Sequence, residues 1–283
     1  MTWTFTDDVE IFAQHAGPLL AARPVQNTIT LTVIEQVRAG GRWSADAILF
    51  GWYRDGQVAG AMSFTPPFEL LLAEVPRRAV AGLVTRLRER GTRLPGVNGE
   101  QDVASGFAEG WVAGTSLRAR LWVRQRLHVL DQLDPPAPAP AGRARIAERG
   151  DLGLVTGWFA AFHAEVGSHA GDAAAMVRDR IGDGLLWLWQ DPEGRPVSLA
   201  GRRHAAAGVA RVGPVYTPPE HRRRGYAAAV TAACSQDALD HGAADVVLFT
   251  DLANPISNAI YHQLGYRPVT DRCVIRFSAD RSN

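Results

Sequence analysis

One segment of the chain, Val212–Ala227, combines residue types that bind anions. A hydrophobic run ends at Tyr216, and the following Pro218-Pro219 turns the chain and withholds two backbone donors from a sheet. Three arginines and a glycine, Arg222 to Gly225, then lead into a run of small residues that favours a helix. The unpaired N–H groups and positive dipole end of a helix start attract anions, and a glycine there lets the backbone approach a phosphate closely. The segment therefore predicts a phosphate or pyrophosphate site, with a solvated basic helix start as the alternative.

A phenol in a second predicted helix is the other candidate for chemistry. Tyr261 lies in the segment 254–264, where Pro255 fits the first helical turn and Gly265 fits the position just past the end. Asn258 precedes Tyr261 by three residues, so both side chains can face one cleft. A phenol can protonate a leaving group. Tyr261 is therefore either a general acid or a buried structural residue, and Asn258 either contacts a ligand or holds its helix in place.

These segments belong to a predicted α/β unit in the second half of the chain. Turn signals at 191–196 and 205–208 separate three hydrophobic stretches that are typical of strands. The complete order is β-α-α-β-β-β-α-β-α-β, which indicates a mixed sheet with helices on its faces. The expected strands are 145–148, 185–189, 197–203, 209–216, 246–250 and 273–277, and the expected helices are 151 onward, 172–181, 224–241 and 254–264.

A proline-rich stretch, 134–142, divides the chain almost at its midpoint. Its prolines cannot continue a helix or donate to a ladder, so it is predicted to be an extended linker. Two weak self-matches at similar offsets indicate an internal duplication, because 53–60 resembles 190–201 and 77–85 resembles 223–231. Chance matching in a chain rich in Arg, Ala, Gly and Val is the alternative. The expected domains are 1–133 and 143–283, joined by the linker 134–142.

Arg222–Ala227 resembles the Gln/Arg-x-x-Gly-x-Gly/Ala pyrophosphate loop of the GNAT acyltransferase superfamily, and Asn254–Tyr266 resembles its second signature. The resemblance covers about residues 143–278, with both motifs in the family's order. It implies an α/β (α+β) fold of two GNAT-like domains, each a mixed, mostly antiparallel sheet flanked by helices. It also implies that acyl-CoA, usually acetyl-CoA, is the donor. No metal is expected.

The resemblance implies roles for individual residues. The main chain of Val215, Tyr216 and Thr217 is expected to pair with the pantetheine arm as an added strand would. Tyr261 is expected to protonate the departing CoA thiolate. The other residues expected to contact the cofactor are Arg222, Arg223, Arg224, Gly225, Tyr226, Ala227, Asn254 and Asn258.

The general base is left open by the sequence. Family members often carry a glutamate on the strand before the pyrophosphate loop, but Val209–Tyr216 contains no carboxylate. A chain of water molecules could also remove the proton. The candidate side chains, by position along the chain, are His163, Glu165, His169, His204 and Glu220.

The first half of the chain is expected to lack a working cofactor site. Aligned on the self-match, Ala79 corresponds to Gly225 and Pro76 to Arg222, which adds a methyl group and removes a cation where phosphate should bind. Residues 1–133 are therefore predicted to be a degenerate GNAT-like domain that supports the second domain and walls part of the acceptor cleft.

The predicted function is transfer of an acetyl group from acetyl-CoA to an amine of a small molecule or peptide, by a monomer or homodimer. A catalytically weak acyl-CoA-binding sensor or regulatory module is the alternative, because no base is evident.

Composition argues against several other classes. The 283 residues carry a net charge of +1, so no global field draws the protein to nucleic acid or to a membrane. Every basic residue is arginine, which excludes Schiff-base chemistry, a pyridoxal phosphate anchor and a Walker-type lysine. With two cysteines, no secretory signal and no long apolar run, the chain is expected to be reduced and cytoplasmic.

Overall fold

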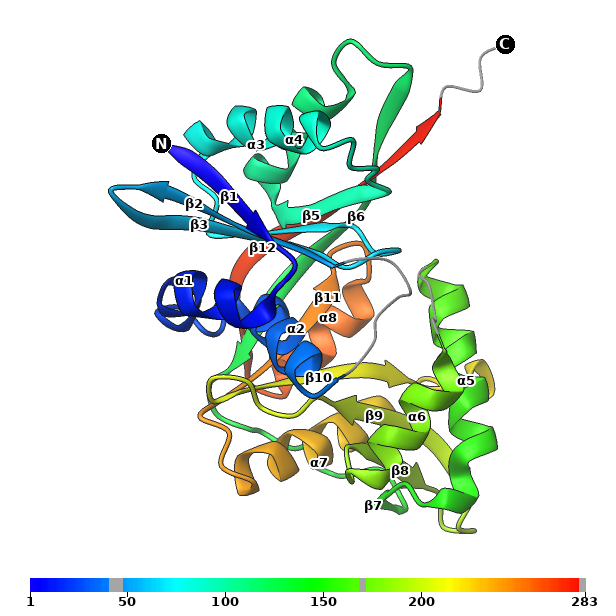
Figure 1. The fold of residues 1–283 in the computed structure, drawn as a ribbon. Helices are drawn as coiled ribbons and strands as arrows, with labels where there is room; N and C mark the ends of the chain where they lie inside the picture. Colours follow the sequence, from blue (N-terminus) through cyan, green and yellow to red (C-terminus); the bar gives the residue numbers. More distant parts are fainter. Residues whose placement is uncertain (41–47, 168–171, 280–283) are drawn as a thin grey trace. The chain divides into compact units, whose positions relative to one another are not determined.

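The computed structural model describes residues 1–40, 48–167 and 172–279 (Figure 1). The chain forms two compact units. The first contains Met1–Leu127, Thr250–Asn254 and the chain from Pro268, and the second contains His128–Phe249 and Pro255–Arg267. This division differs from the contiguous domains of the sequence analysis chiefly in its C-terminal strand, which is part of the first unit. Three strands carry the chain from one unit to the other: β6 (Leu117–Leu130), β11 (Asp245–Asp251) and β12 (Tyr266–Ala279).

The first unit contains a mixed sheet between two pairs of helices. Its elements are β1 (Thr2–Thr6), α1 (Val9–Ala21), α2 (Thr28–Arg38), β2 (Leu49–Asp55), β3 (Gln57–Phe64), β4 (Leu70–Ala73), α3 (Arg77–Glu89), β5 (Gly96–Glu100) and α4 (Gln101–Val112), with parts of β6 and β12. The strand order is β1-β2-β3-β4-β5-β12, in which β4 and β5 are parallel. In Figure 1, α1 and α2 cover one face of this sheet and α3 and α4 cover the other.

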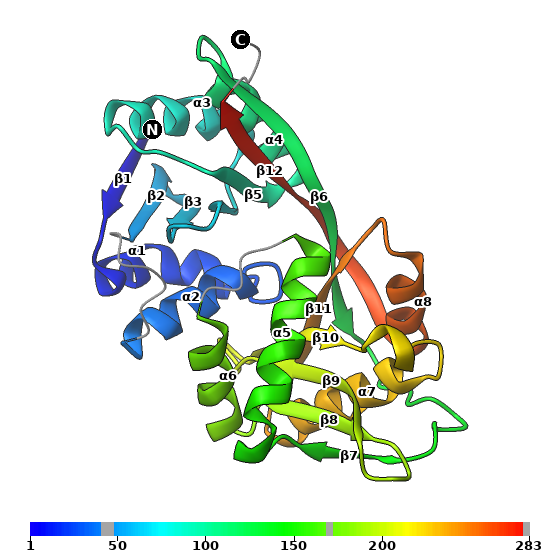
Figure 2. The ribbon, with the colours of Figure 1, turned by 90° about the vertical axis from the view of Figure 1, so that its right-hand side faces the viewer.

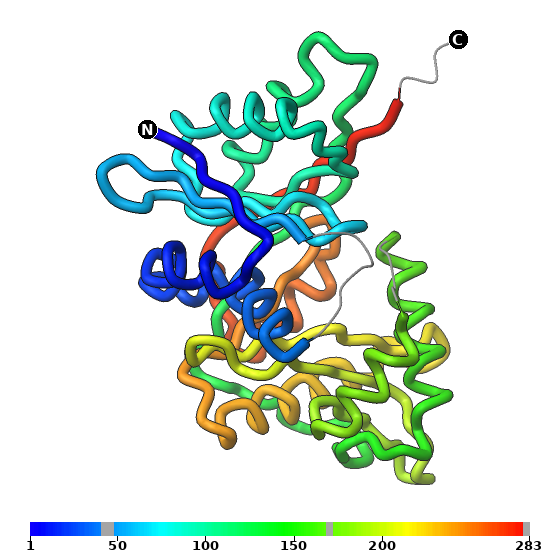
Figure 3. The backbone as a smooth tube through the Cα atoms, viewed as in Figure 1, coloured from blue at the N-terminus to red at the C-terminus, as the bar shows by residue number. Residues whose placement is uncertain are grey.

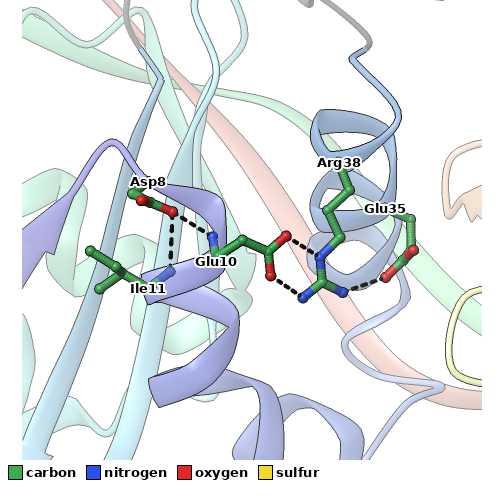
Figure 4. Close-up of polar contacts among 5 residues, drawn as sticks. All are labelled: Asp8, Glu10, Ile11, Glu35 and Arg38. Atoms are coloured by element: carbon green, nitrogen blue, oxygen red, sulfur yellow. Dashed lines mark hydrogen bonds and ion pairs between the residues drawn. The ribbon is translucent and has the colours of Figure 1, made fainter.

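In the first unit, a turn and a helix cap form where the local sequence favours them. The strand–turn–strand expected at 53–60 is confirmed, because β2 and β3 pair around Gly56, whose φ is 71°. The start of α1 is capped by Asp8, whose carboxylate accepts hydrogen bonds from the backbone N–H groups of Glu10 and Ile11 (Figure 4). Both Glu10 and Glu35 pair with Arg38, which ties α1 to α2.

The second unit contains a mixed sheet with helices on both faces. Its elements are β7 (Arg143–Ile146), α5 (Leu152–Val166), α6 (Ala173–Gly182), β8 (Leu186–Gln190), β9 (Pro196–Arg202), β10 (Val209–Tyr216), α7 (Tyr226–Asp240), α8 (Pro255–Gln263) and most of β11. The strand order is β11-β10-β9-β8-β7, and only β10 and β11 are a parallel pair among these strands. In Figure 2, α5 and α6 lie in front of β8 and β9, and α7 lies behind them.

Each face of this second sheet has its own core. On the α7 side, small residues such as Ala229, Val230 and Cys234 pack closely against Val246 and Leu248 of β11. On the α5 and α6 side, a second buried cluster is built around Phe159 of α5. The expected fold class, two mixed sheets flanked by helices, is therefore confirmed.

The last strand is longer than predicted, and its partner could not be read from the sequence. β12 begins at Tyr266 rather than at Cys273. Its residues Arg272–Arg276 pair antiparallel with Gly96–Glu100 of β5 in the first unit, where the red C-terminal strand is seen in Figure 3. Among the helices of the described ranges, none has the length and apolar character that a membrane crossing requires.

Candidate functional site

Strand β10 separates from its parallel neighbour β11 just before the arginine loop, which is the segment Thr217–Gly225. β10 pairs with β11 at three positions, the last of which joins Arg211 to Val247, although both strands continue beyond it. On its other side, the register of β10 against β9 shifts between Val212 and Val215, and the Gly213-Pro214 peptide is cis. The edge of β10 that faces β11 is therefore left without a ladder partner after Arg211, within the part of the chain that the structure describes. An extended ligand could pair there by main chain.

Sequence reasoning missed this irregularity, although a signal for it was present. Gly213-Pro214 lies inside a predicted central strand, and a proline in that position indicates a bulge because it cannot donate to the ladder.

The loop after β10 has a backbone that suits an anion. A short 3₁₀ turn at Pro219–His221 precedes Arg222, and both Arg223 and Gly225 have left-handed φ values, 61° and 79°. Gly225 is the N-cap residue of α7, and no side chain caps this helix. The first N–H groups of α7 are thus available at an exposed helix start, and a loop with left-handed residues can turn successive amides toward one anion.

Glycine is favoured at position 225 by the backbone conformation rather than by a lack of space for a side chain. A Cβ atom added there would lie 3.8 Å from Pro140 of the proline-rich stretch, an ordinary van der Waals distance. Its positive φ, however, strains any residue with a side chain. The stretch that contains Pro140 is itself held in the second unit, because the indole of Trp189 donates to the Ala141 carbonyl at 3.2 Å.

The three loop arginines differ in their surroundings. Arg222 Nε donates to the Thr217 carbonyl at 2.9 Å, and its Nη2 lies 2.7 and 2.9 Å from the two carboxylate oxygens of Glu165 in α5. Arg222 thus braces the loop against α5. By contrast, Arg223 and Arg224 are exposed and make no ion pair with any described residue. Their charges are available to a ligand at the start of α7.

The residues expected to pair with a pantetheine arm lie at the end of β10. The Tyr216 carbonyl accepts from the Ser198 hydroxyl at 3.3 Å, and the Thr217 carbonyl already accepts from Arg222. A carbonyl oxygen has two lone pairs, so each can accept a second hydrogen bond. Val215 is half-buried and packs on the same core as Tyr226, whose buried ring leaves its backbone N–H as the group available to a ligand.

Tyr261 lies on α8 and packs on this same core. Its ring contacts the Tyr266 ring edge-on, with centroids 6.1 Å apart. Burial raises the pKa of the Tyr261 phenol to about 12, so the group keeps its proton at neutral pH. The expected cofactor contacts on this segment are divided, because Asn258 belongs to the second unit with Tyr261 whereas Asn254 belongs to the first.

The candidates for the general base have different environments. Burial, followed by the charge of Arg180, lowers the pKa of His163, which therefore stays neutral at physiological pH. Glu165 is engaged with Arg222, and His204 lies 3.0 Å from Asp183 at an exposed position. Glu220 is exposed, and His169 lies outside the described residues.

One cavity of the second unit lies at the end of α7 that is remote from the arginine loop. It has a volume of about 350 Å³ and is lined by the end of α7 and the start of β10, including the buried ion pair between Arg202 and Asp237. The described residues contain no group of three or more His, Cys, Asp or Glu that could hold a metal ion.

The first unit has a different start to the corresponding helix. Its α3 begins after the N-cap residue Pro76, which therefore takes the place that Gly225 has before α7. Counted from the helix start, Pro76 and not Ala79 corresponds to Gly225, so the alignment used in the sequence analysis is displaced by three residues. A cavity of about 260 Å³ beside Pro76 is lined by the carboxylates of Glu74 and Glu100 and by Arg23, which pairs with Glu74 at 3.0 Å. With two carboxylates and one guanidinium, this lining carries a net negative charge, which disfavours an anion.

Comparison with known proteins supports the fold. Residues 193–275 match the family model described as FR47-like protein. A search of curated proteins finds no match. A solved structure from Drosophila is 13% identical with a TM-score of 0.71, and the match covers 98% of this chain and 99% of the other.

Two further solved structures are similar over nearly the whole chain. A GNAT-family acetyltransferase from Colwellia psychrerythraea is 12% identical with a TM-score of 0.59, and the match covers 98% of this chain and 99% of that one. A tandem GNAT protein from the clavulanic acid biosynthesis pathway is 14% identical with a TM-score of 0.56, covering 99% and 100%. The segment matched by the family model contains β10, the arginine loop, α7 and α8. The resemblance to the GNAT superfamily is thus confirmed at the level of fold: the chain contains two GNAT-like units, and residues 193–275 of it match the FR47-like family.

Proposed function

We propose that the second unit is an N-acetyltransferase that transfers the acetyl group of acetyl-CoA to an amine of a small molecule or peptide. One observation carries this proposal. The ladder between β10 and β11 ends at Arg211, and the loop that follows leads into a helix whose first N–H groups are uncapped at Gly225. A strand edge and an anion site in succession suit a ligand with an amide-containing arm and a diphosphate.

The residues of the loop fit a diphosphate. The amides that open α7, from Gly225 to Ala227, donate to the phosphate oxygens, and the exposed guanidinium groups of Arg223 and Arg224 add charge-assisted hydrogen bonds. Arg222 holds the loop in place through Glu165. The main chain of Val215–Thr217 binds the pantetheine arm as an added strand. When bound, acetyl-CoA supplies an acyl group activated as a thioester.

The proposed role of Tyr261 is to stabilise the sulfur as it leaves. With a pKa of about 12, its phenol is a hydrogen-bond donor throughout the physiological pH range. Complete proton transfer to a thiolate is uphill, because a thiol has a pKa of about 8.5 in water. Donation of a hydrogen bond while the C–S bond breaks is the contribution that this phenol can make. Neutral His163, or water, takes the proton of the attacking amine.

We further propose that residues 1–133 form a degenerate copy, that 134–142 is a linker, and that 143–283 carries the catalytic unit. Pro76 at the start of α3 has no N–H to donate, and the lining of the adjacent cavity, with Glu74, Glu100 and Arg23, carries a net negative charge. Both features support the loss of an anion site in the first copy.

Calorimetry and a thiol-release assay on the full chain test the proposed function. CoA and acetyl-CoA are titrated into the protein, and release of CoA thiol is then followed with a panel of amines. We expect heat on binding, and thiol release that at least one amine accelerates. The absence of heat with any CoA derivative contradicts the donor site, and binding without amine-dependent release contradicts the transfer step.

A further inference from the structure

Two arginines in the second unit, buried Arg180 and partly buried Arg211, have no carboxylate partner among the described residues. Arg180 of α6 is 5% exposed, and its Nη1 donates to the Gly213 carbonyl at 3.2 Å. Its Nε is buried without a hydrogen-bond partner, and so is one terminal nitrogen, Nη1, of Arg211 in β10. Neither arginine forms an ion pair with any residue that the structure describes. Buried guanidinium groups normally find a partner, because an uncompensated charge is costly.

The two arginines lie on one face of the sheet. Alternation along β9 directs Arg202 toward α7, where it pairs with Asp237 at 2.7 Å, so the next residue, Arg203, is directed to the opposite face. The backbone N–H of Arg203 donates to the Arg211 carbonyl, which makes these two residues cross-strand neighbours on that face. Arg180 approaches the same face, where Gly201 leaves room for it. A Cβ atom at Gly201 would lie 3.3 Å from Arg180 Nη1.

The pair is positioned where β10 leaves β11. Arg211 is the last residue of β10 in the parallel ladder, and Gly213, which Arg180 contacts, lies in the register shift just beyond it. The face that carries the arginines is the one covered by α5 and α6 (Figure 2), opposite to the α7 helix whose start forms the proposed diphosphate site. A positive group here is therefore close to the part of β10 proposed to bind the pantetheine arm, but on the other side of the sheet from the proposed diphosphate site.

The surroundings of Arg180 and Arg211 would favour binding of an anion. Burial, and then the charge of Arg203, lowers the pKa of Arg211 to about 9. Burial, and then the charges of Arg203 and Arg211, lowers the pKa of Arg180 well below its usual value. The strongest charges acting on each are thus positive. The opposite face shows the contrast, because its buried Arg202 has a carboxylate in direct contact.

We propose that Arg180 and Arg211 bind a carboxylate or phosphate group of the acceptor, so that the acceptor is an amine that also carries an anionic group. This inference rests on the proposed acetyl transfer and specifies its second substrate. The aromatic ring of Phe159, whose centroid lies 5.5 Å from the Arg180 guanidinium carbon, provides an apolar wall beside the pair. The anionic group of the ligand would then supply the negative charge that no described residue places beside Arg180 and Arg211.

The first test measures anion binding on the full chain. The diphosphate site is first filled with CoA, and acetate, malonate or inorganic phosphate is then titrated while thermal unfolding is followed, with acetamide as the neutral control. Arg211→Met and Arg180→Met remove one charge each, and Arg178→Met on the exposed side of α6 is the matched control. We expect anions, but not acetamide, to raise the unfolding temperature of the wild type and of Arg178→Met. Affinity should fall by at least about tenfold in Arg211→Met.

The same variants distinguish a ligand site from a structural role. Without added anion, Arg211→Met should unfold at the same or a higher temperature than the wild type, because it removes an uncompensated charge. A clearly lower temperature, or an anion response equal to that of the wild type, overturns the proposal. The carboxylate and phosphate arms show which anion is preferred. The heat of CoA binding is measured in a separate calorimetric titration, so loss of the donor site and loss of the anion site give different results. The anion titration is also repeated without CoA.

The second test uses matched acceptors. Glycine and glycinamide, and phosphoethanolamine and ethanolamine, differ in the anionic group while both members of each pair offer an amine. We expect the wild type to prefer the anionic member of at least one pair in kcat/KM. Arg211→Met should reduce that preference by at least about tenfold, mostly by weakening use of the anionic member. Equal use of both members of each pair by the wild type overturns the proposal.

Discussion

Glu165 and Arg222 join α5 to the arginine loop, with Arg222 Nη2 2.7 and 2.9 Å from the two carboxylate oxygens. Both side chains are nearly half exposed, at 47% and 43%. An ion pair so exposed contributes only about 0–1 kcal/mol to stability. Its effect is to hold the first loop arginine away from a ligand and to fix the path of the loop.

Glu165→Gln should therefore alter stability little, by about 1 kcal/mol or less. The amide keeps a hydrogen-bond acceptor, and the loss of a negative charge beside the loop should leave CoA affinity unchanged or slightly higher. Urea unfolding and calorimetry measure the two effects. Abolished thiol release with intact CoA binding would instead identify Glu165 as the general base and contradict its assignment as a brace.

Gly225→Ala should weaken CoA binding strongly. A left-handed φ of 79° costs an L-residue about 1–2 kcal/mol, and relief of that strain moves the amides that open α7. Gly242→Ala is a matched control, because Gly242 has a φ of 82°, has open space around it and lies just past the other end of α7. Both variants should lose similar stability in urea, but Gly225→Ala alone should lose CoA affinity in calorimetry. Equal CoA affinity in the two variants would exclude the helix start as the diphosphate site.

Tyr261→Phe should reduce turnover by about 100-fold or more while CoA affinity stays within about threefold of the wild type. The ring is kept, so the packing on Tyr266 is preserved and only the donor to the sulfur is lost. Because the phenol titrates near pH 12, it should cause no fall in wild-type activity between about pH 7 and 10. Thiol release measured across that range checks both points. Unchanged turnover in the variant would remove Tyr261 from the reaction.

The local parts of this site could be predicted from the sequence, and the long-range parts could not. β10, the turn at Pro218-Pro219 and the start of α7 follow from neighbouring residues, because strand ends, proline turns and glycine caps are local signals. The partner of Arg222 comes from 57 residues away, and no local pattern specifies it.

The same distinction applies to the C-terminal strand and to the two arginines without a carboxylate partner. The strand character of Cys273 and its neighbours was evident, but pairing with β5 depends on how distant segments assemble. No sequence signal marks Arg180 or Arg211, and the burial of Arg180 and of Nη1 of Arg211 becomes evident only when α6 is placed on the sheet.

The free energy of unfolding should fall at alkaline pH because of the buried thiol of Cys234. Burial raises the pKa of its thiol to about 12, above the ordinary value near 9. A folded-state pKa above the unfolded one contributes stability that is present below pH 9 and is lost as the pH rises toward 12. The full loss is about 4 kcal/mol, at about 1.4 kcal/mol for each pKa unit. Urea unfolding between about pH 8 and 9.5, below the ordinary tyrosine pKa of about 10, should show a steeper decline in the wild type than in Cys234→Ala. Parallel declines would contradict this assignment.

The full chain should bind one CoA molecule, although it contains two GNAT-like units. The start of α3 offers a proline where α7 has Gly225, so one backbone donor is missing. Glu74 and Glu100 line the adjacent cavity with Arg23, which pairs with Glu74, and the net negative charge of this lining disfavours a diphosphate. Calorimetry should therefore give a stoichiometry of one, and Gly225→Ala should abolish most of that binding. Pro76→Gly should not create a second site, because the two carboxylates remain. Two CoA molecules bound by the wild type, or one that is retained in full by Gly225→Ala, would show that the first unit is a working copy.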